Sequence, residues 1–267
     1  MTGGTVTDVR EALLRPRPLV RGPGLTPPEL GPGPLLWAVR APQDGPPLDV
    51  SVLDEGERRR AEALRRPAER ALYVAAHTAL RRVLGAYVGL PAASVPLTRL
   101  PCPGCGGPHG RPAVARPYDA GVHFSLAHTD GLALLGLAAG PVGVDVERVP
   151  GARLAADGAR SLHPRERAEL AGLPSAARPA AFARCWTRKE ALVKATGDGL
   201  SGAVLRDRYV GTGARPAGQP GWTVVDVCVP AGWAAACVVP EALSARPAVP
   251  RARRTAPCAS RGSRGRR

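Results

Sequence analysis

Two acidic residues share one face of a short apolar segment, Pro141-Val-Gly-Val-Asp-Val-Glu147. Side chains alternate along a strand, so Asp145 and Glu147 point the same way while the valines between them point toward a core. Two neighbouring carboxylates repel each other unless a cation lies between them, and hard divalent cations prefer oxygen ligands. Gly143 on the same face is expected to leave room beside such a cation. The segment alone is equally compatible with an exposed polar strand face.

A second group of reactive residues follows in Cys185-Trp-Thr-Arg-Lys-Glu-Ala-Leu-Val-Lys194. On a helix, Glu190 and Lys194 are four residues apart and share a face. They could form an ordinary surface ion pair. Alternatively, Glu190 is a third carboxylate, and Lys194 is a proton donor or a phosphate contact. Because Mg²⁺ is held by carboxylates together with substrate phosphates, two strand acids and one helix acid would form a magnesium–phosphate site.

The lysine in this motif has an unusual compositional background. The chain has 37 Lys and Arg residues, and only Lys189 and Lys194 are lysines. A lysine can lose its proton and act as an acid or a base, which an arginine cannot do. The position of both lysines in one motif therefore favours a chemical role for a lysine there over a coding bias toward arginine.

Two further residues could contact an anion. His128 ends the segment His123-Phe-Ser-Leu-Ala-His128 and could either cap a strand or hydrogen-bond a phosphate. Arg111 lies in the Gly110-Arg-Pro112 loop, where the proline restricts the backbone, and it could reach an anion as well.

The elements that must position these residues follow from apolar periodicity and from glycine and proline. We expect a helical region from Asp54 to Gly85 with a possible break at Pro67, and helices at residues 164–170 and 180–196. Short alternating or apolar runs predict strands, in chain order, at residues 35–39, 95–100, 122–126, 132–138, 142–146, 222–229 and 233–239.

This order predicts a mixed α/β (α+β) chain in four parts. Residues 1–34 form a flexible Pro/Gly-rich N-terminus, and residues 35–140 form an N-terminal α/β half. Residues 141–240 form a C-terminal α/β half that contains both acidic motifs. Residues 241–267 form a basic tail whose composition is typical of disorder.

The net charge of +15 is partly an effect of that tail, because eight arginines and no acidic residue follow from Arg246 onward, and removing them leaves +7. A basic surface suits nucleic acid, phosphate-rich small molecules or an acidic protein. A nucleic-acid-binding protein is the alternative function, although aromatic residues make up only 4% of the chain. No segment is apolar over the length needed to cross a membrane. Scattered cysteines and the lack of an apolar signal core predict a cytoplasmic protein.

The two motifs, Gly143-Val-Asp-Val-Glu147 and Trp186-Thr-Arg-Lys-Glu-Ala-Leu-Val-Lys194, together resemble the 4'-phosphopantetheinyl transferase superfamily, and most closely its surfactin-synthetase-activating (Sfp) type. Supporting segments are the Gly-Arg-Pro loop, Phe124-Ser-Leu-Ala-His128, and the Arg-rich helix before His77-Thr-Ala-Leu-Arg81. The resemblance covers about residues 35–240. It implies two similar α/β halves related by a pseudo-twofold axis, with coenzyme A in the cleft between them.

The resemblance also implies a reaction. A 4'-phosphopantetheine group would move from coenzyme A to a serine of an apo acyl or peptidyl carrier protein, releasing 3',5'-ADP. Asp145, Glu147 and Glu190 would hold Mg²⁺, or Mn²⁺ in its place. Glu190 would also be the base for the carrier serine, and Lys194 would protonate the leaving group. We expect a monomer that serves carrier proteins of fatty-acid, polyketide or nonribosomal peptide biosynthesis.

The remaining family positions concern anion binding. Phosphates would be contacted by Arg111, His128 and Lys194. The resemblance also implies a catalytic role for His128. Arg58 and Arg60 belong to a basic run near the 3'-phosphate, where the sequence does not fix which arginine binds. Glu166 matches an acidic family position whose role the resemblance leaves open.

Two positions depart from the family pattern. Arg111 replaces a residue that is often lysine, which preserves the positive charge. Ala127 replaces a common serine before the histidine, which removes a hydroxyl contact and is expected to weaken coenzyme A binding.

Two other readings of the chain compete with this one. Cys102-Pro-Gly-Cys105-Gly-Gly-Pro-His109 has the spacing of a zinc site but offers only three local ligands. His123 could be the fourth, although nothing in the sequence places it there, so a Gly-rich loop is the default. A Ser125/His128/Asp145 hydrolase is disfavoured, because no Gly-x-Ser-x-Gly elbow surrounds the serine.

Overall fold

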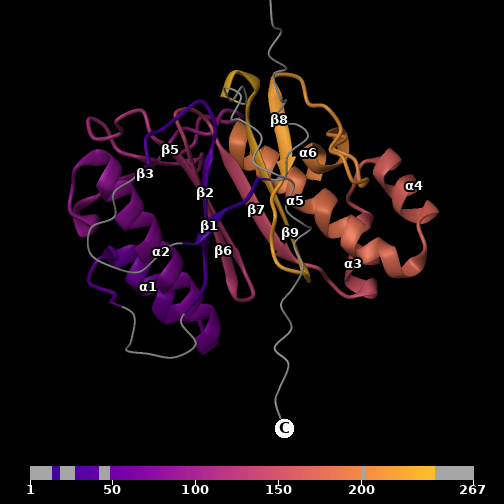
Figure 1. Cartoon of the computed structure of the whole chain (residues 1–267), viewed down its shortest axis with the longest axis horizontal. Coiled ribbons are helices and arrows are strands. Elements are labelled where there is room, and N and C mark those ends of the chain that lie inside the picture. Colours follow the sequence, from indigo (N-terminus) through magenta and orange to yellow (C-terminus); the bar gives the residue numbers. More distant parts are fainter. Residues whose placement is uncertain (1–13, 19–27, 42–48, 200–201, 244–267) are drawn as a thin grey trace, which may run out of the picture.

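Two β-sheets form the centre of the molecule, and helices cover them on opposite sides (Figure 1). The computed structural model describes residues 14–18, 28–41, 49–199 and 202–243. The first sheet has the strand order β1-β2-β6-β5. Its strands are β1 (Arg17–Pro18), β2 (Leu35–Val39), β5 (His123–Thr129) and β6 (Leu132–Ala138). Neighbouring strands pair antiparallel except β1 and β2, which run parallel.

Helices α1 (Glu55–Ala63) and α2 (Pro67–Val88) lie on the outer side of this sheet, with α2 in contact with it. A capping box starts α1: the Asp54 carboxylate accepts from the N–H of Glu57, and the Glu57 carboxylate accepts from the N–H of Asp54. Pro67 is the first residue of α2, where a missing N–H removes no intrahelical bond. The predicted break at Pro67 is therefore confirmed.

The second sheet is antiparallel and has the order β7-β9-β8. Its strands are β7 (Gly143–Arg148), β8 (Trp222–Asp226) and β9 (Trp233–Pro240). A long helix, α5 (Arg178–Thr196), lies across β7 and β9. The shorter helices on this side are α3 (Ala152–Ala159), α4 (Pro164–Gly172) and α6 (Gly202–Asp207).

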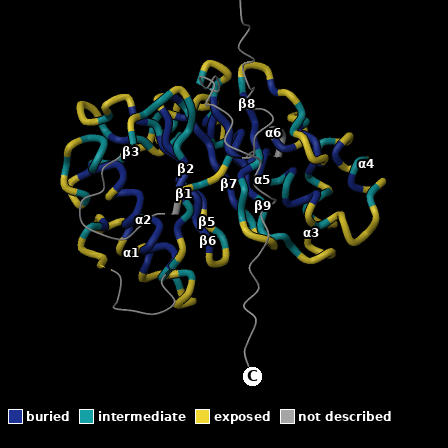
Figure 2. Tube along the Cα trace, in the orientation of Figure 1, coloured by how far each residue is buried: buried dark blue, intermediate teal, exposed yellow. Residues whose placement is uncertain are grey.

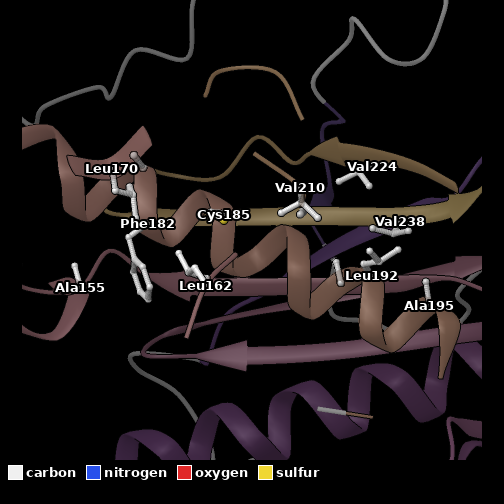
Figure 3. Packing of buried hydrophobic residues seen from close by; sticks show 13 residues of the cluster. Ala155, Leu162, Leu170, Phe182, Cys185, Leu192, Ala195, Val210, Val224 and Val238 are labelled. Atoms are coloured by element: carbon white, nitrogen blue, oxygen red, sulfur yellow. The ribbon is translucent and has the colours of Figure 1, made fainter. Parts of the chain in front are cut away.

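An apolar core fills the space between α5 and the second sheet (Figure 3). Leu192 of α5 packs there with Val224 of β8 and Val238 of β9, whereas Phe182 lies at the other end of the cluster, toward Ala155 of α3 and Leu170 of α4. The helix ends at Gly197, whose left-handed φ of 83° suits glycine and whose N–H closes the last turn on the Val193 carbonyl.

The crossing of α5 over β7 depends on Gly143. A Cβ at this position would lie 1.9 Å from the carbonyl oxygen of Ala191 and 2.5 Å from the backbone nitrogen of Ala195. Only a residue without a side chain lets the strand and helix backbones approach so closely. The expectation that Gly143 leaves room for a cation is wrong, because the helix backbone occupies that space.

The two sheets meet through the edge strands β5 and β7 and through β6. Val144 and Val146 of β7 share a core with Leu134 of β6, which confirms that the valines of this segment face a core. At the edge, the Val144 N–H donates to the Ser125 hydroxyl at 3.1 Å. Because α2 covers its other face, β6 is buried along its whole length. Figure 2 shows this burial concentrated in the sheets and the inner helix faces.

A small two-stranded unit carries the loop before Arg111. It consists of β3 (Leu97–Arg99) and β4 (Pro112–Val114), which pair antiparallel. The remaining short elements are the 3₁₀ helices η2 (Ala92–Ser94), η3 (Ser175–Ala177) and η4 (Glu241–Leu243). Among the described residues, none of the helices has the length and apolar character that a membrane crossing requires.

The mixture of helices and antiparallel sheets confirms the predicted α/β (α+β) class. The N-terminal stretch contributes β1 and a bridge between Leu14 and Val227, so its described part is not the loose segment that was expected. Predicted features at residues 1–13, 19–27 and 244–267 lie outside the described residues. The four-part division of the chain and the pseudo-twofold axis stay predictions.

Candidate active site

The carboxylate of Asp145 lies between β7 and α5. It is 3% exposed, and its Oδ1 accepts from the Lys194 Nζ at 2.6 Å. Its Oδ2 is buried and has no hydrogen-bond partner among the described residues. Burial raises the pKa of Asp145, and the Lys194 charge opposes that rise. An acceptor that is buried without a donor is costly, so Oδ2 is a place where a cation or a ligand donor would be stabilised.

Glu147 lies two residues further along the same face of β7 and is half-buried. Burial, followed by the negative charge of Asp145, raises the pKa of Glu147 to about 7. A hydrogen bond with the side chain of Thr129, at the end of β5, acts in the opposite direction. Each acid therefore opposes the ionisation of the other, as carboxylates do when no cation separates them.

Helix α5 contributes the third acid and the lysine. Glu190 is 7% exposed, and Lys194 follows one turn later. Burial raises the pKa of Glu190 to about 7, with Asp145 and Glu147 adding to the rise and Lys194 opposing it. Three carboxylates and one ammonium thus act on one another at the place where α5 crosses β7.

A pocket of about 260 Å³ opens beside these residues. Glu190 and Lys194 form one wall, β5 residues 124–126 form another, and the loop at 109–112 forms a third. Arg111 is fixed in this loop because its Nη1 donates to the Ala195 carbonyl at 2.6 Å. Burial lowers the pKa of Arg111 without removing its charge at ordinary pH. The pocket is therefore lined by cationic side chains from two separate parts of the chain.

His128 and Arg60 are two further candidate anion contacts. The His128 ring meets the Tyr73 ring edge-to-face at 6.0 Å. His128 is open to solvent, yet desolvation by its neighbours, followed by the charges of His77, Lys194 and Arg60, lowers its pKa. The imidazole is therefore neutral at pH 7 and can act as a hydrogen-bond donor to an anion.

The chain resembles known proteins over this region. Residues 141–210, which contain β7, α5 and all three acids, match a family model described as the 4'-phosphopantetheinyl transferase superfamily. The "4'-phosphopantetheinyl transferase HetI" of Nostoc sp. (strain PCC 7120) is 31% identical over 173 residues, which are 62% of this chain and 69% of that protein. The "Putative 4'-phosphopantetheinyl transferase slr0495" of Synechocystis sp. (strain PCC 6803) is 29% identical over 177 residues, 65% of this chain and 68% of that protein.

The chain belongs to the 4'-phosphopantetheinyl transferase superfamily. It is a transferase, as its relatives are, and the resemblance found in the two sequence motifs is confirmed at the level of the superfamily. Assignment to the surfactin-synthetase-activating type stays a prediction.

The geometry of this transferase distinguishes among the basic residues of α1. Arg58 donates to the Leu53 carbonyl, and Arg59 pairs with Glu55. Arg60 has no hydrogen-bond or ion-pair partner among the described residues, and its charge acts on His128. Arg60 is therefore the residue of this run that is available to an anion at the site, which the sequence alone did not decide.

Lys189 and Glu166 stabilise the fold of the transferase and do not face the site. The Lys189 Nζ is buried, donates to the Leu205 carbonyl at 2.8 Å and pairs with the Glu166 Oε2 at 2.8 Å. Glu166 also accepts from the N–H groups of Val210 and His163. Lys189 and Glu166 therefore hold α4, α5 and the segment after α6 together, and of the two lysines only Lys194 faces the site.

The hydrolase alternative does not fit the geometry. Ser125 is buried, and its hydroxyl accepts from the Val144 N–H. Ser125 and His128 are three residues apart on β5 and so project from opposite faces. Ser125 therefore connects the two sheets through a hydrogen bond. Its side chain is not directed toward His128, as the serine of a catalytic triad would be.

The site also contains Thr129 and Tyr73, which the sequence did not single out, and His77, which it indicated only as part of a family segment. Thr129 contacts Glu147, and Tyr73 stacks on His77 with ring centroids 4.0 Å apart. His77 in turn lies 2.9 Å from Glu57. The spacing of Tyr73 and His77 on one helix face was a usable signal, whereas nothing in the sequence linked either residue to His128.

The carboxylates of Asp145, Glu147 and Glu190 are not all close enough to bind one metal ion in this structure. Among the described residues, one group of three His, Cys, Asp or Glu side chains brings its ligand atoms within 4.8 Å of one another, and it is Cys102, Cys105 and His109. The three acids interact electrostatically but stand further apart. Their mutual repulsion, with the buried Asp145 Oδ2, still fits a divalent cation, whose charge would offset both.

Proposed function

We propose that this transferase moves the 4'-phosphopantetheine group of coenzyme A to the serine hydroxyl of an apo carrier protein. The supporting observation is the electrostatic interaction of Asp145, Glu147 and Glu190, all with raised pKa values, and of Lys194, beside a pocket that Arg111 also lines. An acidic cluster next to cationic side chains suits a cation together with a pyrophosphate.

Asp145, Glu147 and Glu190 would hold Mg²⁺, or Mn²⁺ in its place. The cation supplies charge neutralisation at the pyrophosphate when it is bound. The Asp145 Oδ2 is a suitable ligand atom because the Lys194 ammonium occupies only Oδ1. The proposal requires Glu147 and Glu190 to move closer to that oxygen when the cation binds.

The protein's own residues would handle the protons. The serine oxygen forms a bond to the phosphorus that carries pantetheine, and the bond from that phosphorus to the bridging oxygen breaks. Glu190, with a pKa of about 7, is suited to accept the serine proton. Lys194 would donate a proton to the leaving 3',5'-ADP oxygen, which balances the transfer.

Side chains around the pocket would bind the phosphates. Arg111 is held rigidly on the Ala195 carbonyl, so its guanidinium is preorganised for an anion. His128 would donate a hydrogen bond as the neutral imidazole. We assign the 3'-phosphate to Arg60, because Arg58 is engaged with the Leu53 carbonyl.

The carrier is proposed from charge alone. Carrier proteins are typically acidic, and this chain keeps a net charge of +7 without its arginine tail. Fatty-acid, polyketide and peptide-synthetase carriers are all compatible with that charge, so the assay must include each kind.

The pocket supports the proposed division of the chain. Its walls include Arg111 and Phe124 from residues 35–140 and Glu190 and Lys194 from residues 141–240. We infer that these ranges are two α/β halves related by a pseudo-twofold axis and that coenzyme A binds between them.

Intact-mass spectrometry tests the reaction directly. The full chain is incubated with coenzyme A, Mg²⁺ and each apo carrier, and we expect one phosphopantetheine on a carrier whose serine is present and none after Ser→Ala replacement in the carrier. Absence of the added mass on every carrier would refute the proposal.

The role of Glu190 is tested by Glu190→Gln, with Glu62→Gln as the matched control on the exposed surface of α1. We expect the Glu190 variant to lose at least about 10²-fold in kcat, the scale of general-base catalysis, with unchanged circular dichroism. Equal turnover in the two variants would contradict the assigned role.

A further inference from the structure

The loop between β3 and β4 contains a cluster of side chains that the transfer reaction does not use. The sulfur atoms of Cys102 and Cys105 and a ring nitrogen of His109 all lie within 4.8 Å of one another. The Cys105 Sγ and the His109 Nε2 are 3.0 Å apart. Both cysteines are free thiols. Three such ligands at one point are typical of a zinc site.

The backbone of the loop is folded around the Cys102 sulfur. The N–H of Cys102 donates to the Gly107 carbonyl, and the N–H of Gly106 donates to the Cys102 carbonyl, both at 2.8 Å. The N–H groups of Cys105 and Gly104 also hydrogen-bond to the Cys102 sulfur, so backbone donors fix the position of this sulfur beside the other two ligands.

Two glycines lie beside the ligand pair. A Cβ at Gly107 would lie 3.0 Å from the His109 Cδ2 and 3.3 Å from the Cys105 Sγ. Gly106 has a φ of +72°, a conformation that glycine adopts without strain. These glycines allow the chain to turn tightly enough for His109 to face the two thiols.

We propose that Cys102, Cys105 and His109 bind a zinc ion through two sulfur atoms and one imidazole nitrogen. Two thiolates and one imidazole favour Zn²⁺ over Mg²⁺, which prefers oxygen ligands. Cys105 and His109 are exposed, so solvent can occupy the fourth position. Any proton still on a thiol is released to solvent when the metal binds.

His123 is not part of this site. The sequence offers it as a possible fourth ligand, but it lies at the start of β5 near Asp119 and Arg111, whose charges act on it. It does not belong to the group of converging ligand atoms among the described residues. All three protein ligands therefore come from the loop.

The position of the loop indicates what the zinc would do. Arg111 follows His109 by two residues, its carbonyl accepts from the Leu100 N–H at 2.9 Å, and its side chain contacts Ala195. His109 itself lines the pocket. The zinc would therefore fix the loop that holds Arg111 against the end of α5. This role for Arg111 rests on the proposed function, whereas zinc binding does not.

Metal analysis of the full chain tests the proposal without any enzyme assay. The protein is prepared without a histidine tag in zinc-containing medium and dialysed, and its metal content is measured by inductively coupled plasma mass spectrometry. We expect about one zinc per chain. Cys105→Ser and His109→Asn should each weaken zinc binding at least about 10-fold. Cys228→Ser and His123→Asn are the matched controls and should keep the metal.

Cobalt substitution provides a second readout. The Co²⁺ form should show thiolate-to-metal charge-transfer absorption together with tetrahedral d–d bands, and the sulfur band should weaken in Cys105→Ser. Cys102 is buried, so Cys102→Ser could fail to fold, but the two exposed positions keep the test decisive.

Three results would overturn the proposal: no retained zinc, equal zinc in the ligand variants and the controls, or a Cys102–Cys105 disulfide in freshly purified protein. The outcome is separate from that of the transfer assay. A chain that retains zinc but modifies no carrier would refute the proposed function alone.

Discussion

The Lys194 ammonium lies 2.6 Å from one oxygen of Asp145, while the other oxygen of the same carboxylate is buried without a donor. The contact joins the last turns of α5 to β7. It satisfies Oδ1 of the buried Asp145 carboxylate and leaves Oδ2 available to a ligand. The two lysines of the chain therefore differ: Lys194 is 32% exposed at the pocket, and Lys189 is 1% exposed in a closed pair with Glu166.

This difference predicts that replacing Lys189 mainly lowers stability, whereas replacing Lys194 mainly lowers activity. Lys189→Met should lower the free energy of unfolding by about 3–5 kcal/mol, because it leaves the buried Glu166 without its cation. Lys194→Met should lower it by only about 1–2 kcal/mol, because solvent reaches this ammonium and Asp145, whose pKa is already raised by burial, can take up a proton when the lysine is removed. Lys194→Met should nevertheless lose most activity. Urea unfolding with turnover assays measures both. Similar stability losses in the two variants would count against this assignment.

The raised pKa values of Glu147 and Glu190 predict a pH-dependent response to Mg²⁺. A carboxyl whose folded pKa is raised stabilises the fold below its ordinary pKa, and this stabilisation is lost as pH rises through about 7. A cation that binds the ionised acids offsets the loss. Mg²⁺ should therefore raise the melting temperature more at pH 8 than at pH 6. Thermal unfolding in both buffers measures this.

Two controls sharpen the Mg²⁺ experiment. Sodium chloride at equal ionic strength should reproduce little of the shift, because it only screens the acids. Glu190→Gln should reduce the difference between pH 8 and pH 6, because one of the titrating ligands is gone. A shift that is the same at both pH values would argue against a cation at these carboxylates.

The close approach at Gly143 predicts a strong effect of one methyl group. Gly143→Ala places a Cβ 1.9 Å from the Ala191 carbonyl oxygen, so α5 must move away from β7. We expect a loss of about 3 kcal/mol or more, at the upper end of overpacking effects. Gly172→Ala is the control, because nothing lies within 4 Å of its Cβ. Chemical denaturation compares them, and equal stabilities would show that the crossing is looser than described.

Arg60 and Arg59 provide a matched pair on one helix. Arg59 is paired with Glu55, whereas the Arg60 charge acts on His128. Arg60→Ala should weaken coenzyme A binding by about 1.5–3 kcal/mol, the range for a charge-assisted hydrogen bond, and Arg59→Ala should leave it unchanged. Isothermal titration calorimetry measures both affinities. Equal affinities in the two variants would remove Arg60 from the binding site.

Local sequence patterns predicted much of the fold. The strands at residues 35–39 and 132–138 have the predicted bounds, and the break at Pro67 is present. Helix α3 was missed, because it is only eight residues long, begins after Gly151 without a side-chain cap and has Gly158 in its last turn. It is held by contact with α5, which no local pattern records.

The site was predicted less evenly. The alternation on β7 and the helical spacing on α5 placed the three acids and Lys194 on faces that could meet, and the resemblance of the paired motifs to the family was needed to select them. The sequence could not distinguish Lys189 from Lys194 by environment, nor Arg60 from Arg58, because these differences arise from packing partners far along the chain. The same limit applies to the loop cysteines. Their spacing indicated a possible metal site, but only the folded loop shows that His109 approaches them.

Two contacts between distant segments have a common asymmetry. Ser125 contacts the backbone N–H of Val144, and Arg111 contacts the backbone carbonyl of Ala195. In both, the side chain belongs to residues before 140 and the backbone group to residues after it. Substitution of the side chain at position 144 or 195 therefore leaves the backbone N–H or carbonyl in place, whereas substitution at position 125 or 111 removes the hydroxyl or guanidinium. In chimaeras with a homologue, the parent protein that supplies the residues before 140 should determine whether these two hydrogen bonds form.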